Sequence, residues 1–422
     1  MFDRISVVGL GYIGLPTAAL FAVHGTEVIG VDVSARVVDT INDGRIHIIE
    51  PDLDGVVHKV VTEGKLRATL TAEPADAFII AVPTPFCDGY KPDLSYIENA
   101  IRTIAPVLKK GDLIILESTS PVGATEQMSQ WLAEARPDIS FPQSAGEGAD
   151  VQVAHCPERV LPGHVLRELV ENDRVIGGMT EKASKMAVDL YRRVVKGDCV
   201  ITTVRTAEMC KLTENSFRDV EIAFANELSM ICEKIGVDVW ELISLANRHP
   251  RVNILQPGAG VGGHCIAVDP WFIVSSVPDE AKIIRAARAI NDSKPVWVVE
   301  QGRRKIMELL DNCPERTMEN VTVSCLGLAF KPDIDDLRES PALQITRQFA
   351  RLNCRVLAVE PHIEELPESL KELGVQLIGI EEALKADIVI VLVRHSAFRG
   401  LKERFSNGAN LLDFVGLEAG KS

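Results

Sequence analysis

The sequence has no apolar run long enough to cross a membrane. Its longest runs, Phe78–Val82 and Ile388–Val393, are far shorter than the ~18 residues that a membrane-spanning helix needs, and they are typical of buried strands. The N-terminal Met1–Arg4 leads directly into a strand pattern, which leaves no room for the charged and apolar regions of a secretory leader. We therefore expect no membrane association and a cytoplasmic location.

The sequence also lacks paired cysteines and an excess of positive charge. Its nine cysteines include no C-x-x-C pair, which argues against a disulfide framework and against a zinc site. The 45 Lys and Arg are outnumbered by 60 Asp and Glu, which gives a formal charge of -15. Without a basic block, this charge argues against nucleic-acid binding. We expect no bound metal, and any anionic ligand must be held by local positive groups.

The N-terminal region alternates strand and helix patterns. An apolar strand over Ile5–Leu10 runs into a G-x-G-x-x-G turn, a helix over Leu15–His24 follows, and a second strand over Glu27–Val33 contains Asp32 near its end. Alternation of this kind predicts a parallel sheet with helices on both faces. Further strands are expected over Ala77–Val82, Leu113–Glu117, Asp150–His155 and Arg174–Ile176, with helices that include Tyr96–Leu108 and Thr125–Leu132.

The pattern changes near Thr206. From there to Arg248 the chain contains no proline and one glycine, Gly236, which predicts a long helix to about Ile235 and a shorter helix from Asp238.

Strand and helix patterns then return, with strands over Val321–Gly327 and Arg355–Glu360 that echo the beginning of the chain. We predict an α/β fold of two Rossmann-like doubly wound units joined by a helical central domain. The expected bounds are 1–200 for the dinucleotide-binding domain, 201–300 for the central and dimerisation domain, and 301–422 for the second Rossmann-like domain.

The glycine-rich turn predicts a dinucleotide site. Gly9, Gly11 and Gly14 would allow a tight turn and a close approach of pyrophosphate to the following helix, with Tyr12 and Ile13 completing the turn. Asp32 would bond the ribose hydroxyls and repel a 2′-phosphate, which favours NAD over NADP. Glycines that merely fit a tight turn are the alternative, and the neighbouring Arg36 leaves an opening for NADP.

Two later strand ends carry hydroxyl groups that can reach the same ligand. Thr84 follows the third strand in a V-P-T-P segment, and Thr119 and Thr125 belong to an E-S-T-S-P-V-G-A-T segment after the fourth. Ligands of doubly wound sheets bind at the carboxyl ends of the strands. We therefore predict cofactor contacts at these three threonines, with ordinary turns as the alternative.

Cys265 lies in the most unusual segment of the sequence. Four glycines, at 258, 260, 262 and 263, precede it, and Asp269 lies four residues beyond it. A thiolate can add to an aldehyde, and the thiohemiacetal can lose hydride to become a thioester that water cleaves. Such chemistry extends a two-electron alcohol oxidation to a four-electron one. An inert buried cysteine in a flexible loop is the alternative.

Two further groups of polar residues are candidates for this chemistry. Lys211, Asn215 and Arg218 share one face of the long predicted helix, where Lys211 could stabilise an oxyanion and Asn215 could orient a water. Glu158 and Arg159, in a C-P-E-R segment after a strand, offer a base for thioester hydrolysis and an anion contact. A solvated helix face and a surface ion pair are the alternatives.

Six motifs occur in order over nearly the whole chain. They are the G-x-G-x-x-G turn, E-S-T-S-P-V-G, C-P-E-R, K-x-x-x-N, G-x-G-G-x-C-x-x-x-D and F-K-P-D-I-D-D-L-R-E-S over residues 330–340. Together they resemble the UDP-glucose/GDP-mannose dehydrogenase family, and the ordered set is far more specific than any one motif. The resemblance implies that the N-terminal unit binds NAD, the C-terminal unit binds the nucleotide diphosphate, and the middle helix forms the core of a homodimer.

The resemblance also implies roles for individual residues. Cys265 would be the nucleophile, Lys211 and Asp269 would handle protons and the oxyanion, Asn215 would position water or substrate, and Glu158 would assist thioester hydrolysis. Arg338 would reach the cofactor, and Arg251 would contact the substrate of the partner subunit. The substrate-binding residues implied are Arg159, Val160, Lys211, Asn215, Arg218, His249, Arg251, Gly262, Phe330 and Lys331.

Two positions near Cys265 depart from the UDP-glucose enzymes, which usually have Ser and Lys where this chain has His264 and Val268. The surrounding residues resemble the branch that acts on UDP-N-acetylamino sugars. We expect oxidation of UDP-N-acetyl-D-mannosamine to its uronate, a precursor of surface polysaccharide. UDP-N-acetylglucosamine and UDP-glucose remain alternatives, and the configuration at sugar C2 is left open. Arg394 replaces an Asp common in relatives, which leaves the role of its loop open.

Two other classes of function remain. A two-electron hydroxyacid or alcohol dehydrogenase of similar build would need no nucleophilic cysteine. A noncatalytic NAD-binding sensor would keep the fold and bind without turnover.

Overall fold

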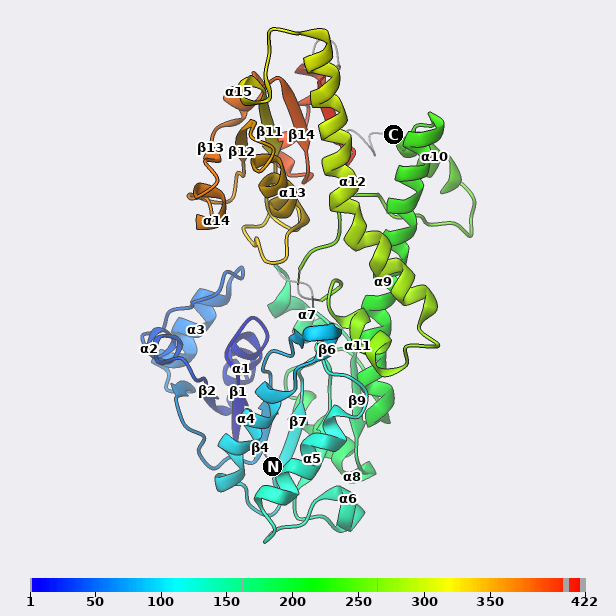
Figure 1. Ribbon diagram of the computed structural model, residues 1–422. Coiled ribbons are helices and arrows are strands. Elements are labelled where there is room, and N and C mark those ends of the chain that lie inside the picture. Colours follow the sequence, from blue (N-terminus) through cyan, green and yellow to red (C-terminus); the bar gives the residue numbers. More distant parts are fainter. Residues whose placement is uncertain (1, 161–162, 264, 405–409, 418–422) are drawn as a thin grey trace. The chain divides into compact units, whose positions relative to one another are not determined.

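The computed structural model describes residues 2–160, 163–263, 265–404 and 410–417. The chain divides into two compact units, residues 1–214 and 215–422, and the division falls within the long helix α9, Val204–Ile235 (Figure 1). The predicted bounds of three domains stay a prediction. Among the described residues, no helix combines the length and the apolar character needed to cross a membrane.

The first unit contains an eight-stranded sheet of order β10-β9-β8-β7-β4-β1-β2-β3. Strands β3 to β8 of this sheet have the 3-2-1-4-5-6 order of a doubly wound dinucleotide-binding fold, which confirms the predicted fold class. The strands are β1 Arg4–Val8, β2 Glu27–Val31, β3 Leu66–Thr69, β4 Ala77–Ile80, β7 Leu113–Leu116, β8 Gln152–His155, β9 Arg174–Gly178 and β10 Cys199–Thr203; a separate hairpin pairs β5 Phe86–Cys87 with β6 Lys91–Pro92.

Helices cover both faces of this sheet because its strands are apolar on both sides. Ile5 and Val7 of β1 pack into one hydrophobic cluster with α1 and α3, whereas Val8 packs into a second cluster with α4 and α5. The helices of the unit are α1 Gly14–Val23, α2 Ala35–Asn42, α3 Leu53–Thr62, α4 Ser95–Ile104, α5 Ala124–Ala135, α6 Pro142–Ala145, α7 Val165–Glu171 and α8 Glu181–Tyr191.

The expectation of a fully parallel sheet is wrong at one edge. Strand β9 runs antiparallel to β8, with His155 opposite Gly177, and β10 follows the direction of β9. A parallel connection must return the chain to the opposite edge of the sheet. Helix α7 has seven residues and spans only about 10 Å, so the chain stays near the carboxyl end of β8 and enters β9 from that side. Continuing this register places Glu158 opposite Arg174.

The second unit contains a five-stranded parallel sheet of order β13-β12-β11-β14-β15. This is again a 3-2-1-4-5 order, so the second Rossmann-like unit is confirmed. Its strands are β11 Thr322–Leu326, β12 Arg355–Val359, β13 Gln376–Leu377, β14 Ile388–Val391 and β15 Leu411–Asp413; its helices are α10 Val239–Ala246, α11 Asp269–Ser276, α12 Lys282–Asn312, α13 Pro341–Ala350, α14 Glu368–Lys371 and α15 Ile380–Ala383.

Helices α9 and α12 are joined by buried polar contacts at intervals of about one or two turns. Arg288 donates to Asp219 at 2.6 Å, and Asn226 donates to Asn291 at 2.9 Å. The Nζ of Lys294 donates to the Oγ of Ser229 at 2.5 Å. Since buried polar groups need partners, these pairs fix which faces of the two helices meet.

The two units build the turn after their first strand in the same way. Gly9 and Gly327 have φ angles of +91° and +92°, and each N–H donates over 2.8 Å to the carbonyl of the last residue of the neighbouring strand, Val31 and Val359. A carboxylate beyond that strand then accepts the next N–H of the turn, Asp32 in the first unit and Glu360 in the second. The repeat suggested by the sequence therefore extends to individual hydrogen bonds.

Substitution of Gly327 by Ala should destabilise the second unit strongly. A Cβ there would lie 2.4 Å from the Cβ of Val393, so overpacking of about 1–3 kcal/mol adds to the ~1–2 kcal/mol cost of a left-handed residue. Gly374→Ala is the matched control, because Gly374 has φ +75° and no atom within 4 Å of its Cβ position. Denaturant unfolding should show a clearly larger loss for Gly327→Ala, and equal losses would contradict the packing argument.

Candidate active site

The glycine-rich turn of the first unit is shaped by two close contacts. A Cβ on Gly9 would lie 2.6 Å from the carbonyl oxygen of Ala81, and a Cβ on Gly14 would lie 1.7 Å from the carbonyl oxygen of Gly9. These glycines therefore serve the fold itself, because they let β1, β4 and the start of α1 approach one another.

Gly11 differs, because a Cβ there would meet no atom of the chain within 4 Å and its φ is not positive. The fold does not require glycine at this position, whereas a pyrophosphate lying against the backbone would. Ile13 is the N-cap of α1 and provides no side-chain cap, so the positive end of the helix is available to an anion. Gly11, Tyr12 and Ile13 thus fit the phosphate-binding part of a dinucleotide site.

Asp32 and Thr84 fit the same ligand. The Asp32 carboxylate accepts the N–H groups of Leu10 at 3.0 Å and Ser34 at 2.9 Å, yet it is only partly buried, so its remaining lone pairs can accept ribose hydroxyls. The Thr84 hydroxyl is buried and has no hydrogen-bond partner among the described residues. A bound ligand would supply that partner.

The other two predicted threonines differ in environment. Thr119 is partly exposed, whereas Thr125 is fully buried and donates its hydroxyl to Glu208 at 2.7 Å. Glu208, on α9, also accepts the N–H groups of Gly123 and Thr125 and so caps the start of α5. Burial raises the pKa of Glu208, and its hydrogen bonds oppose the shift. The cofactor role of both threonines stays a prediction.

Cys265 is exposed and lies one turn before α11 in the second unit. Its carbonyl accepts the Asp269 N–H at 2.9 Å, so the segment from Cys265 to Asp269 is already helical in its hydrogen bonding. Asn215 donates its side-chain amide to the Asp269 carboxylate at 2.5 Å. The structure therefore brings two of the predicted catalytic residues together and places the Asp269 carboxylate, 4% exposed, at the end of the cysteine segment.

The glycines before Cys265 are required by packing. A Cβ on Gly262 would lie 2.5 Å from the carbonyl oxygen of Glu339 and 2.8 Å from the Cβ of Phe330, and a Cβ on Gly263 would lie 2.9 Å from the Phe330 ring. The cysteine segment thus lies directly against the loop 330–340 that carries Lys331. His264, between the glycines and the cysteine, lies outside the described residues.

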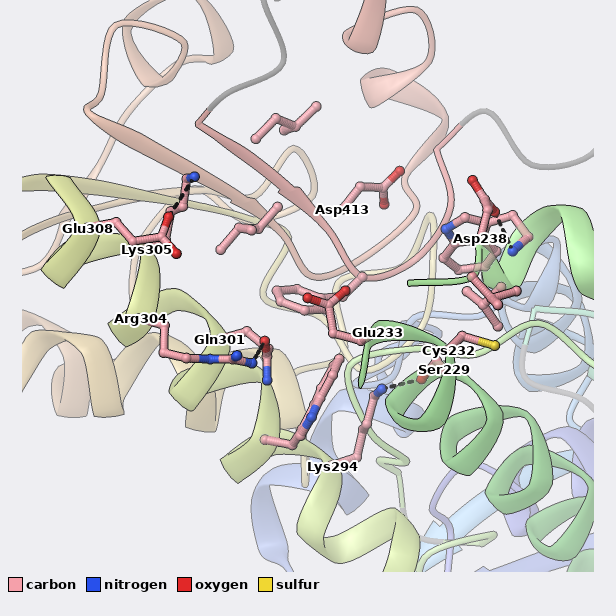
Figure 2. A pocket seen from close by; sticks show the side chains of 17 residues that line it. Ser229, Cys232, Glu233, Asp238, Lys294, Gln301, Arg304, Lys305, Glu308 and Asp413 are labelled. Atoms are coloured by element: carbon pink, nitrogen blue, oxygen red, sulfur yellow. Dashed lines mark hydrogen bonds and ion pairs between the residues drawn. The ribbon is translucent and has the colours of Figure 1, made fainter. Parts of the chain in front are cut away.

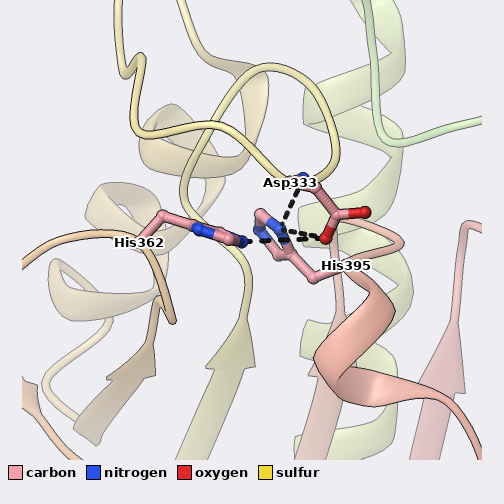
Figure 3. A group of neighbouring side chains, drawn as sticks. All are labelled: Asp333, His362 and His395. Carbon is pink, nitrogen blue, oxygen red and sulfur yellow. Dashed lines mark hydrogen bonds and ion pairs between the residues drawn. The ribbon is translucent and has the colours of Figure 1, made fainter. Parts of the chain in front are cut away.

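Side chains from two other strand ends hold the 330–340 loop. The N–H of Asp333 donates to His395 Nδ1 at 3.0 Å, so the proton of the ring is on Nε2, which donates to Glu360 at 3.1 Å. Figure 3 shows Asp333 beside His395 and His362. Asp333 in turn accepts from the backbone N–H and the hydroxyl of Ser396. The ligand-type atoms of Asp333, His362 and His395 lie within 4.8 Å of one another, but both His395 nitrogens are engaged. The cluster therefore anchors the loop and is a poor metal site.

The basic residues predicted to bind ligands fall into two groups. Arg338 forms a bidentate pair with Asp336, and Arg159 pairs with Glu214 at 2.6 Å. The side chains of Lys211, Lys331 and Arg218 form no hydrogen bond or ion pair with the described residues, so their charges are available to an anionic ligand.

The remaining predicted substrate residues lie in two loops. Val160 is partly buried against the core of the first unit. His249 and Arg251 are exposed in the segment after α10, where the N–H of Arg251 donates to His249 Nδ1 at 3.3 Å. The side chain of Asn247 closes this segment through two hydrogen bonds to Ile254.

Glu158 is almost buried and belongs to a charged cluster that the sequence did not reveal. Its carboxylate accepts from Arg174 at 2.6 Å, and Arg174 also lies 3.8 Å from the buried Glu117. The sequence offers one signal for this cluster, which is Arg174 at the start of an apolar strand. A buried arginine requires an acidic partner, so its position in a strand could have indicated one. Glu208 and His395 were missed as well.

A separate pocket of about 570 Å³ lies between α9, α10, α12 and β15 (Figure 2). Lys294 lines it with its amine 3.8 Å from the centroid of the Trp297 ring, and burial lowers the pKa of Lys294 to about 7. None of the residues predicted for the site lines this pocket.

Comparison with known proteins identifies the class of the chain. Residues 3–195 match the NAD-binding domain, residues 205–293 the central domain, and residues 324–416 the UDP-binding domain of the UDP-glucose/GDP-mannose dehydrogenase family. An NAD-dependent dehydrogenase acting on a UDP-sugar is thereby confirmed, and NAD is its cofactor. The chain belongs to the UDP-glucose/GDP-mannose dehydrogenase family.

Individual relatives cover the whole length. The chain is 62% identical to the UDP-N-acetyl-D-mannosamine dehydrogenase of Yersinia pestis over 95% of this chain and 96% of the relative. It is 60% identical to an NDP-N-acetyl-D-galactosaminuronic acid dehydrogenase of Ralstonia nicotianae over 100% of this chain and 97% of the relative. The solved UDP-D-ManNAc dehydrogenase of Pyrococcus horikoshii is 40% identical in sequence and has a TM-score of 0.85. The match covers 98% of this chain and 96% of the solved chain.

Replacement of Gly11 by Ala should weaken NAD binding without destabilising the fold. The added methyl group meets no protein atom but enters the space assigned to pyrophosphate. We expect at least about tenfold weaker NAD binding by calorimetry, about 1.4 kcal/mol, with an unchanged melting temperature. Gly55→Ala is the control, because Gly55 is equally open and lies on α3. Unchanged affinity in Gly11→Ala would argue against this assignment.

Proposed function

We propose that the chain oxidises the C6 alcohol of UDP-N-acetyl-D-mannosamine to a carboxylate through a covalent intermediate on Cys265. The observation that carries the proposal is an exposed cysteine between a tightly packed glycine segment and a helix that begins with Asp269, whose carboxylate is bonded to Asn215. NAD, when bound, accepts the electron pair of each oxidation as hydride. The product would serve as a cytoplasmic precursor of surface polysaccharide.

The first half of the reaction yields an aldehyde and then a thioester. The alcohol loses a proton and a hydride to give the aldehyde, and the Cys265 sulfur then forms a bond to the aldehyde carbon. The resulting thiohemiacetal loses a second proton and hydride to become a thioester. Lys211, which has no anionic partner among the described residues, supplies positive charge to the oxyanion, and Asp269 takes up the proton.

The second half of the reaction is hydrolysis. Water adds to the thioester carbon, the C–S bond breaks, and the Cys265 thiol is restored as the carboxylate leaves. Glu158 accepts the proton of that water, and Asn215 orients it. In sum, one alcohol, one water and two NAD give one carboxylate, two NADH and three protons.

The identity of the sugar rests on named relatives. The Yersinia pestis enzyme is named for UDP-N-acetyl-D-mannosamine, and the solved Pyrococcus horikoshii enzyme for the same sugar. The Ralstonia nicotianae relative is named for a galactosaminuronic acid, so a UDP-N-acetylgalactosamine-type substrate is the second candidate. All three names share a 2-acetamido group, consistent with Val268 replacing the lysine of the UDP-glucose enzymes.

Helix α9 supports the homodimer. Phe217, Phe224 and Ile231 recur at seven-residue spacing and are 61%, 50% and 47% exposed. Seven residues are two helical turns, so the three side chains form one apolar stripe, as in helices that pair. Within that dimer, the exposed Arg251 is proposed to contact the substrate of the partner subunit.

A panel of UDP-sugars tests the proposed substrate. With NAD present, kcat/KM should be highest for UDP-N-acetylmannosamine and at least about tenfold lower for UDP-glucose, because one missing polar group costs ~1–3 kcal/mol or more in the transition state. UDP-N-acetylgalactosamine and UDP-N-acetylglucosamine complete the panel. A preference for UDP-glucose would reject the acetamido assignment, and binding without turnover of any sugar would favour an NAD-binding sensor.

Substitution of Phe224 by Asp should separate the dimer. A charge in the middle of the stripe removes a buried aromatic contact worth about 2 kcal/mol or more. Light scattering at micromolar concentration should show dimers of the wild type and monomers of the variant. Tyr96→Asp, at a residue 47% exposed on α4, should remain dimeric. A dimeric Phe224→Asp would place the interface elsewhere.

A further inference from the structure

Glu158 shares a buried site with a second carboxylate and one guanidinium. Glu117 follows β7, Glu158 lies in the loop after β8, and Arg174 begins β9. Their exposed fractions are 1%, 6% and 3%. Two acids and one base in a dry environment cannot all be charged at low cost, because burial penalises each uncompensated charge.

The contacts divide the two acids into unequal roles. Arg174 donates to Glu158 at 2.6 Å but lies 3.8 Å from Glu117, and the second Glu158 oxygen accepts the N–H of Arg159 at 2.6 Å. Among the described residues, the hydrogen bonds that Glu117 accepts through its side chain come from neutral hydroxyls, Tyr191 at 3.0 Å and Thr17 at 3.3 Å. The stronger cationic contact therefore belongs to Glu158.

Cys156 lies beside the cluster and is neutral, because burial raises the pKa of its thiol to about 12. The next charged group along the chain is Arg159, whose guanidinium pairs with Glu214 at 2.6 Å and not with the two acids of the cluster. Burial and the nearby Glu158 raise the pKa of Glu117 to about 7, against the opposing effect of Arg174. Of the two acids, Glu117 is therefore the one that binds a proton more readily, because it lacks the close cationic contact that Glu158 has.

We propose that Arg174 and Glu117 are positioning residues for Glu158: Arg174 holds its carboxylate in place through the 2.6 Å contact, and Glu117 takes up the proton of the pair so that it does not compete for Arg174. This inference rests on the proposed function, in which Glu158 takes the proton of the hydrolytic water. It makes the hydrolysis half of the reaction depend on two side chains within the protein core. Thr17 lies in the first turn of α1, the helix that follows the glycine-rich turn, so the cluster also contacts that helix.

The test separates hydrolysis from hydride transfer. In Arg174→Met the two acids lose their counter-charge, the proton is no longer confined to Glu117, and thioester hydrolysis should slow. We expect kcat to fall about 100-fold, the size of a lost general base, with KM changed less than about twofold. Intact-mass spectrometry should then detect acyl-enzyme on Cys265, which the wild type does not accumulate.

Glu117→Gln supplies the discriminating comparison, because glutamine mimics the protonated acid. The single variant Glu117→Gln should hydrolyse the thioester at a rate within about threefold of the wild-type rate. The double variant should hydrolyse it at least about tenfold faster than Arg174→Met does, because the competing acid is gone. A merely structural role for Arg174 would make the double variant no faster than the single one. Arg67→Met, which breaks an exposed pair with Glu73 in the same unit, is the control and should be unaffected.

Three results would overturn the inference: an Arg174→Met enzyme without acyl-enzyme, a double variant without recovery, or a severe loss in Glu117→Gln. If Arg174→Met does not fold, Arg174→Lys replaces it. Lysine keeps the positive charge, but it is shorter than arginine and cannot make the same contact with Glu158. The Arg174→Lys variant should still accumulate acyl-enzyme, less so when combined with Glu117→Gln. Failure of the proposed function is distinguishable, because the wild type itself would then release fewer than two NADH per sugar.

Discussion

The contact on which the candidate site depends is the packing of Gly262 and Gly263 against the 330–340 loop. Gly262 lies against the backbone carbonyl of Glu339 and the side chain of Phe330, and Gly263 lies against the Phe330 ring, so neither position has room for a side chain. This contact holds the backbone two residues before Cys265 against the loop that carries Lys331. The two glycines therefore give a closely packed junction, as the proposed role of Cys265 as a nucleophile requires.

The turn after the first strand has the same geometry in the two Rossmann-like units but serves a different purpose in each. In the first unit the Asp32 carboxylate holds the turn and remains partly exposed, as a ribose contact requires. In the second unit Glu360 holds the corresponding turn but is buried under His395, which also accepts from the Asp333 backbone. The acid of the second unit thus anchors the 330–340 loop and cannot act as a ribose acceptor in this arrangement. The same carboxylate-held glycine turn therefore supports the predicted cofactor site in the first unit and the 330–340 loop in the second.

Sequence patterns predicted most elements because their signals are local. Apolar runs, the proline-free stretch and the glycine-rich turn located β1, α1, α9 and both sheets within a few residues. The reversal of β9 could not be predicted, since it depends on whether α7 crosses the sheet, and composition does not report that. The pairing of Glu158 with Arg174 follows from that reversal and was hidden for the same reason.

Individual side chains were predicted by type and spacing, which do not show where a hydroxyl or a charge is already used. The Thr125 hydroxyl is bonded to Glu208, and Arg159 and Arg338 are paired with acids of the chain itself. Asn215 and Asp269 are 54 residues apart, and their contact needed the folded chain. The roles of these residues in binding and catalysis therefore stay predictions.

The central claim, a four-electron oxidation through Cys265, is tested most directly by counting NADH released per molecule of UDP-N-acetylmannosamine consumed, with the product sugar identified by mass. We expect two NADH and a uronate for the wild type, and loss of the uronate in Cys265→Ala. One NADH per sugar with an aldehyde product, or an unchanged count in Cys265→Ala, would contradict it.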